Sequence, residues 1–124
     1  SSKYQFFNQT QLTVAEKVRG IIEPQAVVLT ASNHNHWLPA LTGRQIIMGY
    51  PGWLWTYGID YLPRQADVTK MYQGSAELLD QYQVDYVVIG PDETNMWPDL
   101  NETYFSANFP AVFDAAGYKV FKLK

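Results

Sequence analysis

Three apolar runs along this chain predict buried strands. They cover residues 26–31, 45–49 and 84–90. A strand that is covered on both faces has an almost unbroken apolar sequence, because both of its sides lie in the core. We therefore expect these three strands to be covered on both faces of a sheet. A fourth run, residues 118–123, alternates less regularly and contains two lysines. This pattern favours a strand at the edge of the sheet.

Helical patterns separate the strands. Thr13 and Glu16 have capping-box spacing, apolar residues follow at helical intervals, and Pro24 is expected to end this first helix. A short helix is predicted over residues 66–72, and another over 76–83 with Ser75 as its N-cap. A last helix is predicted from Asn108, with proline in its first turn, to a glycine stop at residue 117. Residues 92–106 are expected to form a long polar loop.

The order of these elements predicts the α/β class. Strands separated by helices imply a three-layer sandwich with a mostly parallel, Rossmann-like sheet of about four strands, the last of them at an edge. The 124 residues are expected to form a single domain, 47% hydrophobic and 17% charged. The nine basic residues are scattered and the net charge is −3, so we expect no nucleic-acid partner.

Other features narrow the class of protein. There is no cysteine, which excludes a disulfide scaffold and a thiolate metal site. No apolar run approaches the length of a membrane span. The chain starts Ser1-Ser2 without an initiator methionine, so we interpret it as a domain excised from a larger protein.

The most unusual segment is residues 49–61, which contains two tryptophans, three tyrosines and three glycines. Such a mixture suits neither a helix nor a strand. Its rings could stack on sugars while neighbouring polar groups bind hydroxyls, or they could cover the core of the domain itself. The aromatic residues proposed for contact are Tyr50, Trp53, Trp55 and Tyr57.

Polar segments follow each of the three predicted buried strands. If the strands are parallel, these segments share one edge of the sheet, where ligands of open α/β sheets usually bind. From them we select the candidate binding residues His34, Asn35, His36 and Glu93, and we add Arg44 as a cation for a phosphate or carboxylate. Arg44 could equally pair with an acidic residue of the chain, such as Asp60 or Asp67.

Enzymatic chemistry has less support. His34 and His36 could hold one metal ion with Asp92 or Glu93, but the spacing fixes no third ligand, so we expect no metal. No nucleophile is spaced beside either histidine. No glycine-rich phosphate loop follows the first strand, so we expect no nucleotide cofactor, and indeed no cofactor at all. Catalytic residues are predicted to be absent.

The chain resembles a known region of membrane proteins. The resemblance is carried by residues 41–44 (Leu-Thr-Gly-Arg), 48–55 (Met-Gly-Tyr-Pro-Gly-Trp-Leu-Trp), 58–61, Arg64, 67–68, 71–72 and 82–90. These residues are similar to the C-terminal soluble region of polytopic membrane proteins of the glycosyltransferase C superfamily type. Such proteins use lipid-linked sugar donors on the extracytoplasmic side of the membrane, and their catalytic carboxylates lie between membrane helices.

The resemblance implies that this chain alone is not catalytic. It implies an extracytoplasmic domain of a membrane-embedded glycosyltransferase-like protein, which contacts glycan or substrate or caps the membrane active site. The implied partners are the membrane portion of the same protein and a glycan or lipid-linked sugar. Two alternatives remain: a binding module for a small sugar-like molecule, and a purely structural docking domain. A hydrolase using His34 or His36 comes last.

Overall fold

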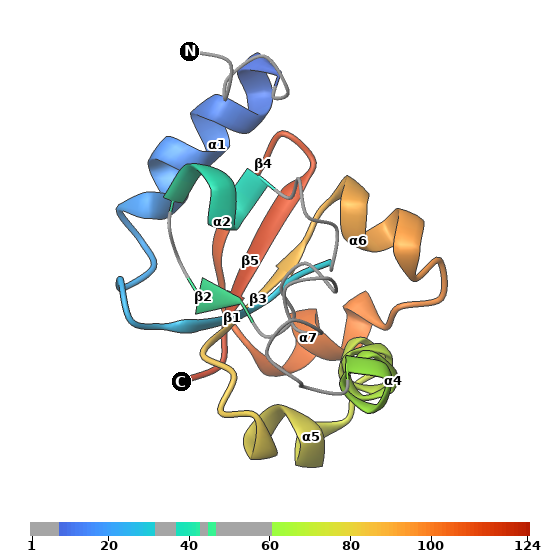
Figure 1. Cartoon of the computed structure of the whole chain (residues 1–124). Helices are drawn as coiled ribbons and strands as arrows, with labels where there is room; N and C mark the ends of the chain where they lie inside the picture. Colours follow the sequence, from blue (N-terminus) through green and yellow to red (C-terminus); the bar gives the residue numbers. More distant parts are fainter. Residues whose placement is uncertain (1–7, 32–36, 43–44, 47–60) are drawn as a thin grey trace.

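A computed structural model describes residues 8–31, 37–42, 45–46 and 61–124 of the chain (Figure 1). The helices that it contains are α1 (Gln9–Arg19), α2 (Trp37–Thr42), α4 (Tyr61–Tyr72), α5 (Ala76–Gln81), α6 (Pro91–Met96) and α7 (Glu102–Asn108). The strands are β1 (Val27–Leu29), β2 (Gln45–Ile46), β3 (Tyr86–Ile89), β4 (Ala111–Ala115) and β5 (Tyr118–Lys122). The alternation of helices and strands confirms the α/β class.

The strands form one mixed sheet in the order β2-β1-β3-β5-β4. β1 is parallel to both β2 and β3, and Val28 pairs with Ile46 on one side and with Tyr86 on the other. β5 is antiparallel to β3 and to β4, with Val88 opposite Val120. The parallel pairs are only two residues long in the described part of the chain, whereas each antiparallel pair has four. The predicted mostly parallel, Rossmann-like sheet is therefore not confirmed.

The final part of the chain corrects two predictions. Residues 108–117 do not form a helix, because β4 lies there and pairs with β5. Pro110 favours an extended residue before it, and Phe109 has φ −135° and ψ 147° as the C-cap of α7. The proline therefore ends a helix instead of starting one. β4 also takes the outer position in the sheet, so the last strand is not at an edge as predicted.

A two-residue turn joins β4 to β5. Ala115 pairs with Tyr118, and the residues between them, Ala116 and Gly117, have φ of 57° and 86°. Two consecutive positive φ angles match the twist of a tight hairpin. The glycine that was predicted to stop a helix is needed here for the turn.

Helices cover both faces of the sheet, as expected for three layers (Figure 1). On one face α1 and α2 pack on side chains that alternate along the strands, and the buried residues there include Val18, Trp37, Val28, Val88 and Val120. On the other face α4, α5 and α7 pack on the intervening strand residues, and the buried residues there include Met71, Leu79, Phe105, Val87 and Phe121. The strands β1, β3 and β5 thus have apolar side chains on both sides.

Helix boundaries differ from the sequence-based predictions at several places. α1 begins earlier than expected, because Asn8 forms the capping box with Gln11, and Thr13 lies inside the helix. The predicted cap of α5 is confirmed, since the Ser75 hydroxyl oxygen accepts a hydrogen bond from Leu78 N at 3.3 Å. Residues 92–106 are largely helical instead of a loop, and they form most of α6 and the first part of α7.

Candidate functional site

The carboxyl ends of β1, β2 and β3 lie at one edge of the sheet, because these strands are parallel. We call this edge, where Leu29, Ile46 and Ile89 end their strands, the carboxyl edge. From β1 the chain passes to β2 on one side and then crosses back to β3 on the other. The order of strands therefore reverses between β1 and β3, which is where ligands enter many α/β sheets.

Glu93 occupies this position between β1 and β3. Its side chain is 0% exposed. One carboxylate oxygen accepts a hydrogen bond from Gly90 N and the other from Ala31 N, both at 2.8 Å. Gly90 is the N-cap of α6, so the first bond belongs to a capping box and the second joins the start of the helix to the end of β1. A buried carboxylate is tolerated there because backbone donors replace water on both oxygens.

Tyr72 fills the adjacent space from α4. Its hydroxyl group lies 2.8 Å from the carbonyl oxygen of Val88 and 3.1 Å from that of Leu29, and it donates between the two strands. Burial raises the pKa of Tyr72 well above its usual value, and the negative charge of Glu93 adds to this effect. The ring stacks on Trp97, with centroids 4.6 Å apart. Side chains of the protein itself therefore close the usual ligand position between β1 and β3.

An open pocket lies beside this closed position, at the end of β3. We call it the edge pocket; its volume is about 290 Å³, and it is lined by Ile89, Gly90, Pro91, Thr94, Glu102, Gly117 and Lys119. Lys119 Nζ forms an ion pair with Glu102 Oε2 at 2.6 Å, and this hydrogen bond raises the pKa of the lysine. The Thr94 hydroxyl group lies 3.2 Å from the carbonyl oxygen of Gly90. The pocket thus offers an ammonium, a carboxylate and a hydroxyl group around an apolar wall.

Most of the predicted binding residues cannot be compared with this geometry. Outside the described residues lie His34, Asn35, His36, Arg44, Tyr50, Trp53, Trp55 and Tyr57. Glu93 is described, and it is placed at the carboxyl edge as the sequence implied, but with both oxygens bonded to backbone. Its role as a ligand contact stays a prediction. The edge pocket was missed because Glu102 and Lys119 are 17 positions apart and no spacing rule connects them.

A metal site has no support from the described part of the chain, where no three residues among His, Cys, Asp and Glu are grouped to hold an ion. Both histidines lie outside that part, so the prediction about them stays untested. The helices that the structure describes are all too short or too polar to cross a membrane.

Comparisons with known proteins identify a similar fold. No family model matches the sequence, and no curated protein matches it. Among solved structures, the chain is similar to the C-terminal globular domain of an oligosaccharyltransferase from Archaeoglobus fulgidus, with a TM-score of 0.60 and 10% sequence identity. The match covers 95% of this chain and 99% of the archaeal domain. At this identity the likeness concerns the fold alone, and the chain shares the fold of the archaeal domain.

Proposed function

We propose that this chain is an extracytoplasmic domain of a membrane-embedded glycosyltransferase-like protein and that it contacts glycan or caps the membrane active site without being catalytic alone. The observation that carries the proposal is the fold match, which extends over 95% of this chain and 99% of the oligosaccharyltransferase domain. A match of such extent concerns a whole domain and not a shared motif. The sequence resemblance to glycosyltransferase-type C-terminal regions supports the same assignment from separate evidence.

The carboxyl edge is the proposed contact surface. Segments that contain His34, Asn35 and His36, and then Tyr50, Trp53, Trp55 and Tyr57, follow β1 and β2 in the sequence. The edge pocket lies at the end of β3, and about 290 Å³ is enough for one sugar ring. Glu102, Lys119 and Thr94 supply polar groups of the kind that bind sugar hydroxyls, and aromatic rings supply stacking.

A docking role is the second candidate, and one observation favours it. Glu93 and Tyr72 close the position between β1 and β3, so the usual ligand crevice of this fold class is filled by the protein. In that case the carboxyl edge would contact the membrane portion of the same protein through its aromatic segment. A free-standing module for a small sugar-like molecule is the third candidate.

Titration with neutral oligosaccharides separates these candidates. Glycan contact predicts a change in tryptophan fluorescence and shifts of the Gly90, Thr94 and Gly117 amide resonances in NMR spectra. The fluorescence change should disappear in a Trp53→Ala/Trp55→Ala variant. Thr94→Val should weaken binding, whereas Thr10→Val on α1 should not. If no glycan perturbs these signals and the domain instead binds the purified membrane portion, the docking role holds and glycan contact is wrong.

A further inference from the structure

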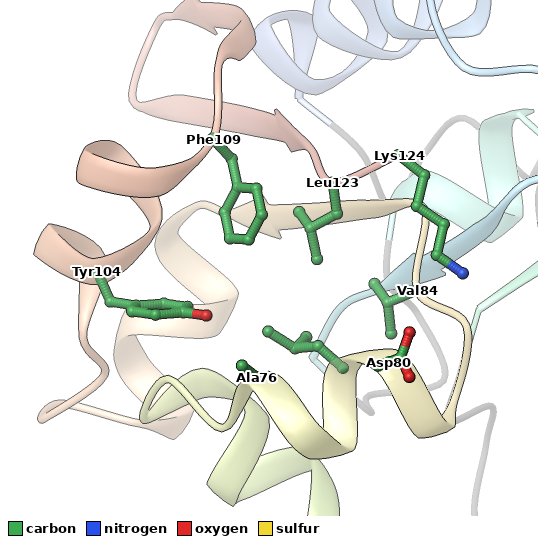
Figure 2. A pocket seen from close by; sticks show the side chains of 8 residues that line it. Ala76, Asp80, Val84, Tyr104, Phe109, Leu123 and Lys124 are labelled. Carbon is green, nitrogen blue, oxygen red and sulfur yellow. The ribbon is translucent and has the colours of Figure 1, made fainter.

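A second cavity lies at the opposite end of the sheet from the carboxyl edge. Its volume is about 170 Å³. Val84 precedes β3 and Leu123 follows β5, and Leu123 N donates to Asp85 O at 2.8 Å, which places both at the amino end of β3. We call this cavity the amino-end pocket; Figure 2 shows its lining residues, which are Ala76, Leu79, Asp80, Val84, Tyr104, Phe109, Leu123 and Lys124.

The apolar walls of the amino-end pocket are held by packing in the protein. Leu79 is 4% exposed and Val84 1% exposed, so both belong to the core. The Tyr104 ring makes edge contacts with Phe105 and Phe109, at centroid distances of 5.2 and 5.9 Å. The Tyr104 hydroxyl group points into the pocket from one end (Figure 2). Because these contacts fix the walls, a ligand would not have to order them on binding.

The size of the pocket limits what it can hold. An engineered protein cavity of about 150 Å³ with apolar walls binds benzene, so this pocket suits one six-membered ring or a branched aliphatic group. It is too small for a disaccharide or a nucleotide, which need pockets of about 300 Å³ or more. The volume therefore suits a single apolar side chain or its equivalent.

Two opposite charges stand at the other end of the pocket from Tyr104. Asp80 and Lys124 line that end together, and both residues are exposed (Figure 2). A carboxylate attracts an ammonium group of a ligand, and an ammonium attracts a carboxylate. A ligand with only one charge would be attracted by one of these residues and repelled by the other. A ligand with both charges on one carbon would be attracted by both.

We infer that the amino-end pocket binds the zwitterion of a free α-amino acid with a single-ring or branched apolar side chain. The side chain fills the space beside Leu79, Val84 and Tyr104. The α-ammonium group faces Asp80, and the α-carboxylate faces Lys124. This site is separate from the carboxyl edge and does not depend on the function proposed for that edge.

Titration of the whole chain with L-phenylalanine and L-leucine tests the inference by NMR. We expect saturable shifts of the Leu79, Val84 and Leu123 resonances, with a dissociation constant of about 1 mM for a ligand of this size. Ala76→Phe fills the pocket from an exposed helix position and should abolish binding. Gln81→Phe places the same ring on the same helix outside the pocket and should leave binding unchanged.

Charge analogues test the role of the two ionic residues. 2-Phenylethylamine lacks the carboxylate and 3-phenylpropionate lacks the ammonium. Each should bind at least about threefold more weakly than L-phenylalanine. Asp80→Asn should weaken the binding of L-phenylalanine but not that of 3-phenylpropionate, which has no ammonium group. Lys124→Gln should weaken the binding of L-phenylalanine but not that of 2-phenylethylamine, which has no carboxylate.

Three results would overturn the inference. The first is the absence of shifts at these residues with either amino acid. The second is binding that persists in Ala76→Phe. The third is binding of uncharged benzyl alcohol as tight as that of L-phenylalanine, because the charges would then contribute nothing. The Ala76→Phe variant should keep any response to oligosaccharides at the carboxyl edge, so failure of one proposal is distinguishable from failure of the other.

Discussion

Individual residues in this domain have backbone or electrostatic roles that their type does not reveal. Asp and Glu side chains at positions 92 and 93 could both have been solvated residues of a turn, and only the fold shows that Glu93 is buried between two strands. Sequence reasoning found Glu93 because it follows a strand that was correctly predicted. It could not predict which backbone N–H groups donate to Glu93, because one of them belongs to Ala31, which lies 62 positions away.

Replacement of the Glu93 carboxylate tests this role. In Glu93→Gln one oxygen becomes an amide group that cannot accept from a backbone N–H, so one buried donor loses its partner. We expect the free energy of unfolding to fall by about 2–3 kcal/mol. Urea denaturation measures this loss, and hydrogen exchange should quicken at the Ala31 and Gly90 amides. Glu77→Gln, on the exposed side of α5, should change the stability by less than about 0.5 kcal/mol. Equal effects of the two variants would contradict the assignment.

Ala116 is strained at the hairpin turn. Its φ of 57° lies in the left-handed region, which disfavours alanine by about 1 kcal/mol. Asn-Gly is the preferred pair for a turn of this kind, so Ala116→Asn should stabilise the protein by about 0.5–1 kcal/mol. Thermal unfolding measures the gain. Ala115→Asn, one position earlier in β4, should give no gain, because asparagine is disfavoured in strands.

At the scale of elements, the buried strands β1 and β3 and the capped helix α5 were predictable, whereas the region after β3 was not. The apolar runs that predicted β1 and β3 indicate burial on both faces. This signal does not depend on whether the neighbouring strand is parallel or antiparallel. The signals for α6 and α7 were present in Pro91 and Asn101, a proline at a helix start and an N-cap, but the polar residues between them resembled a loop. Pairing in the β4–β5 hairpin overrode the helical pattern of residues 108–117.

Close packing between elements makes Gly90 necessary. A Cβ atom at this position would lie 2.7 Å from Cδ1 of Tyr118, the first residue of β5. The Tyr118 ring is itself held by an edge contact with Trp37 of α2, at 5.6 Å between centroids. Gly90→Ala should therefore lower the free energy of unfolding by about 1–3 kcal/mol.

Gly20→Ala is the matched control for this change. A Cβ at Gly20 would meet Lys17 O at 3.6 Å, an ordinary contact, and its φ of −82° suits any residue. Chemical denaturation of both variants gives the comparison. A loss of stability in Gly20→Ala as large as in Gly90→Ala would show that the tyrosine contact is not the cause.

For the whole molecule, the pattern of strands predicts the fold class but not the order and direction of the strands in the sheet. Local sequence shows where a strand lies and whether both faces are covered, but the direction of its partner depends on contacts far along the chain. The antiparallel pairing of β3 with β5 is such a contact. The candidate site could not be predicted for the same reason, because residues of β3, α6, α7 and the hairpin turn line the edge pocket together. Only the placement of polar segments after parallel strands could be expected in advance.

Alkaline pH should destabilise the whole domain through Tyr86. Burial raises the pKa of Tyr86 to about 12, and its hydrogen bond to Glu23 Oε2 at 2.7 Å contributes to this shift. Tyrosine in an unfolded chain has a pKa of about 10. Below pH 10 both states keep the proton, so the stability is intact. Between pH 10 and 12 the unfolded state loses the proton first, and about 3 kcal/mol of stability is lost.

Urea denaturation at pH 8, 10, 11 and 12 measures this loss. Tyr86→Phe should make the decline over that interval shallower, and the part that remains is expected from Tyr72, whose pKa is also raised by burial. The stability of Tyr86→Phe at pH 8 should be about 1 kcal/mol lower because the hydrogen bond is absent. Glu23→Gln should keep most of the decline, since burial is the larger cause of the shift. A decline in Tyr86→Phe as steep as in the unchanged chain would show that other groups cause it.

The packing of α1 on β5 also has a consequence for synthesis on the ribosome. Val14 and Val18, near the start of the chain, share a cluster with Tyr118 and Val120, near its end. During translation α1 is made first, and this part of its apolar face stays uncovered until about a hundred further residues have left the exit tunnel. Contacts between distant parts of a chain form slowly, and exposed apolar surface invites aggregation while they form. This cluster of the domain can therefore be completed only after its last strand has emerged.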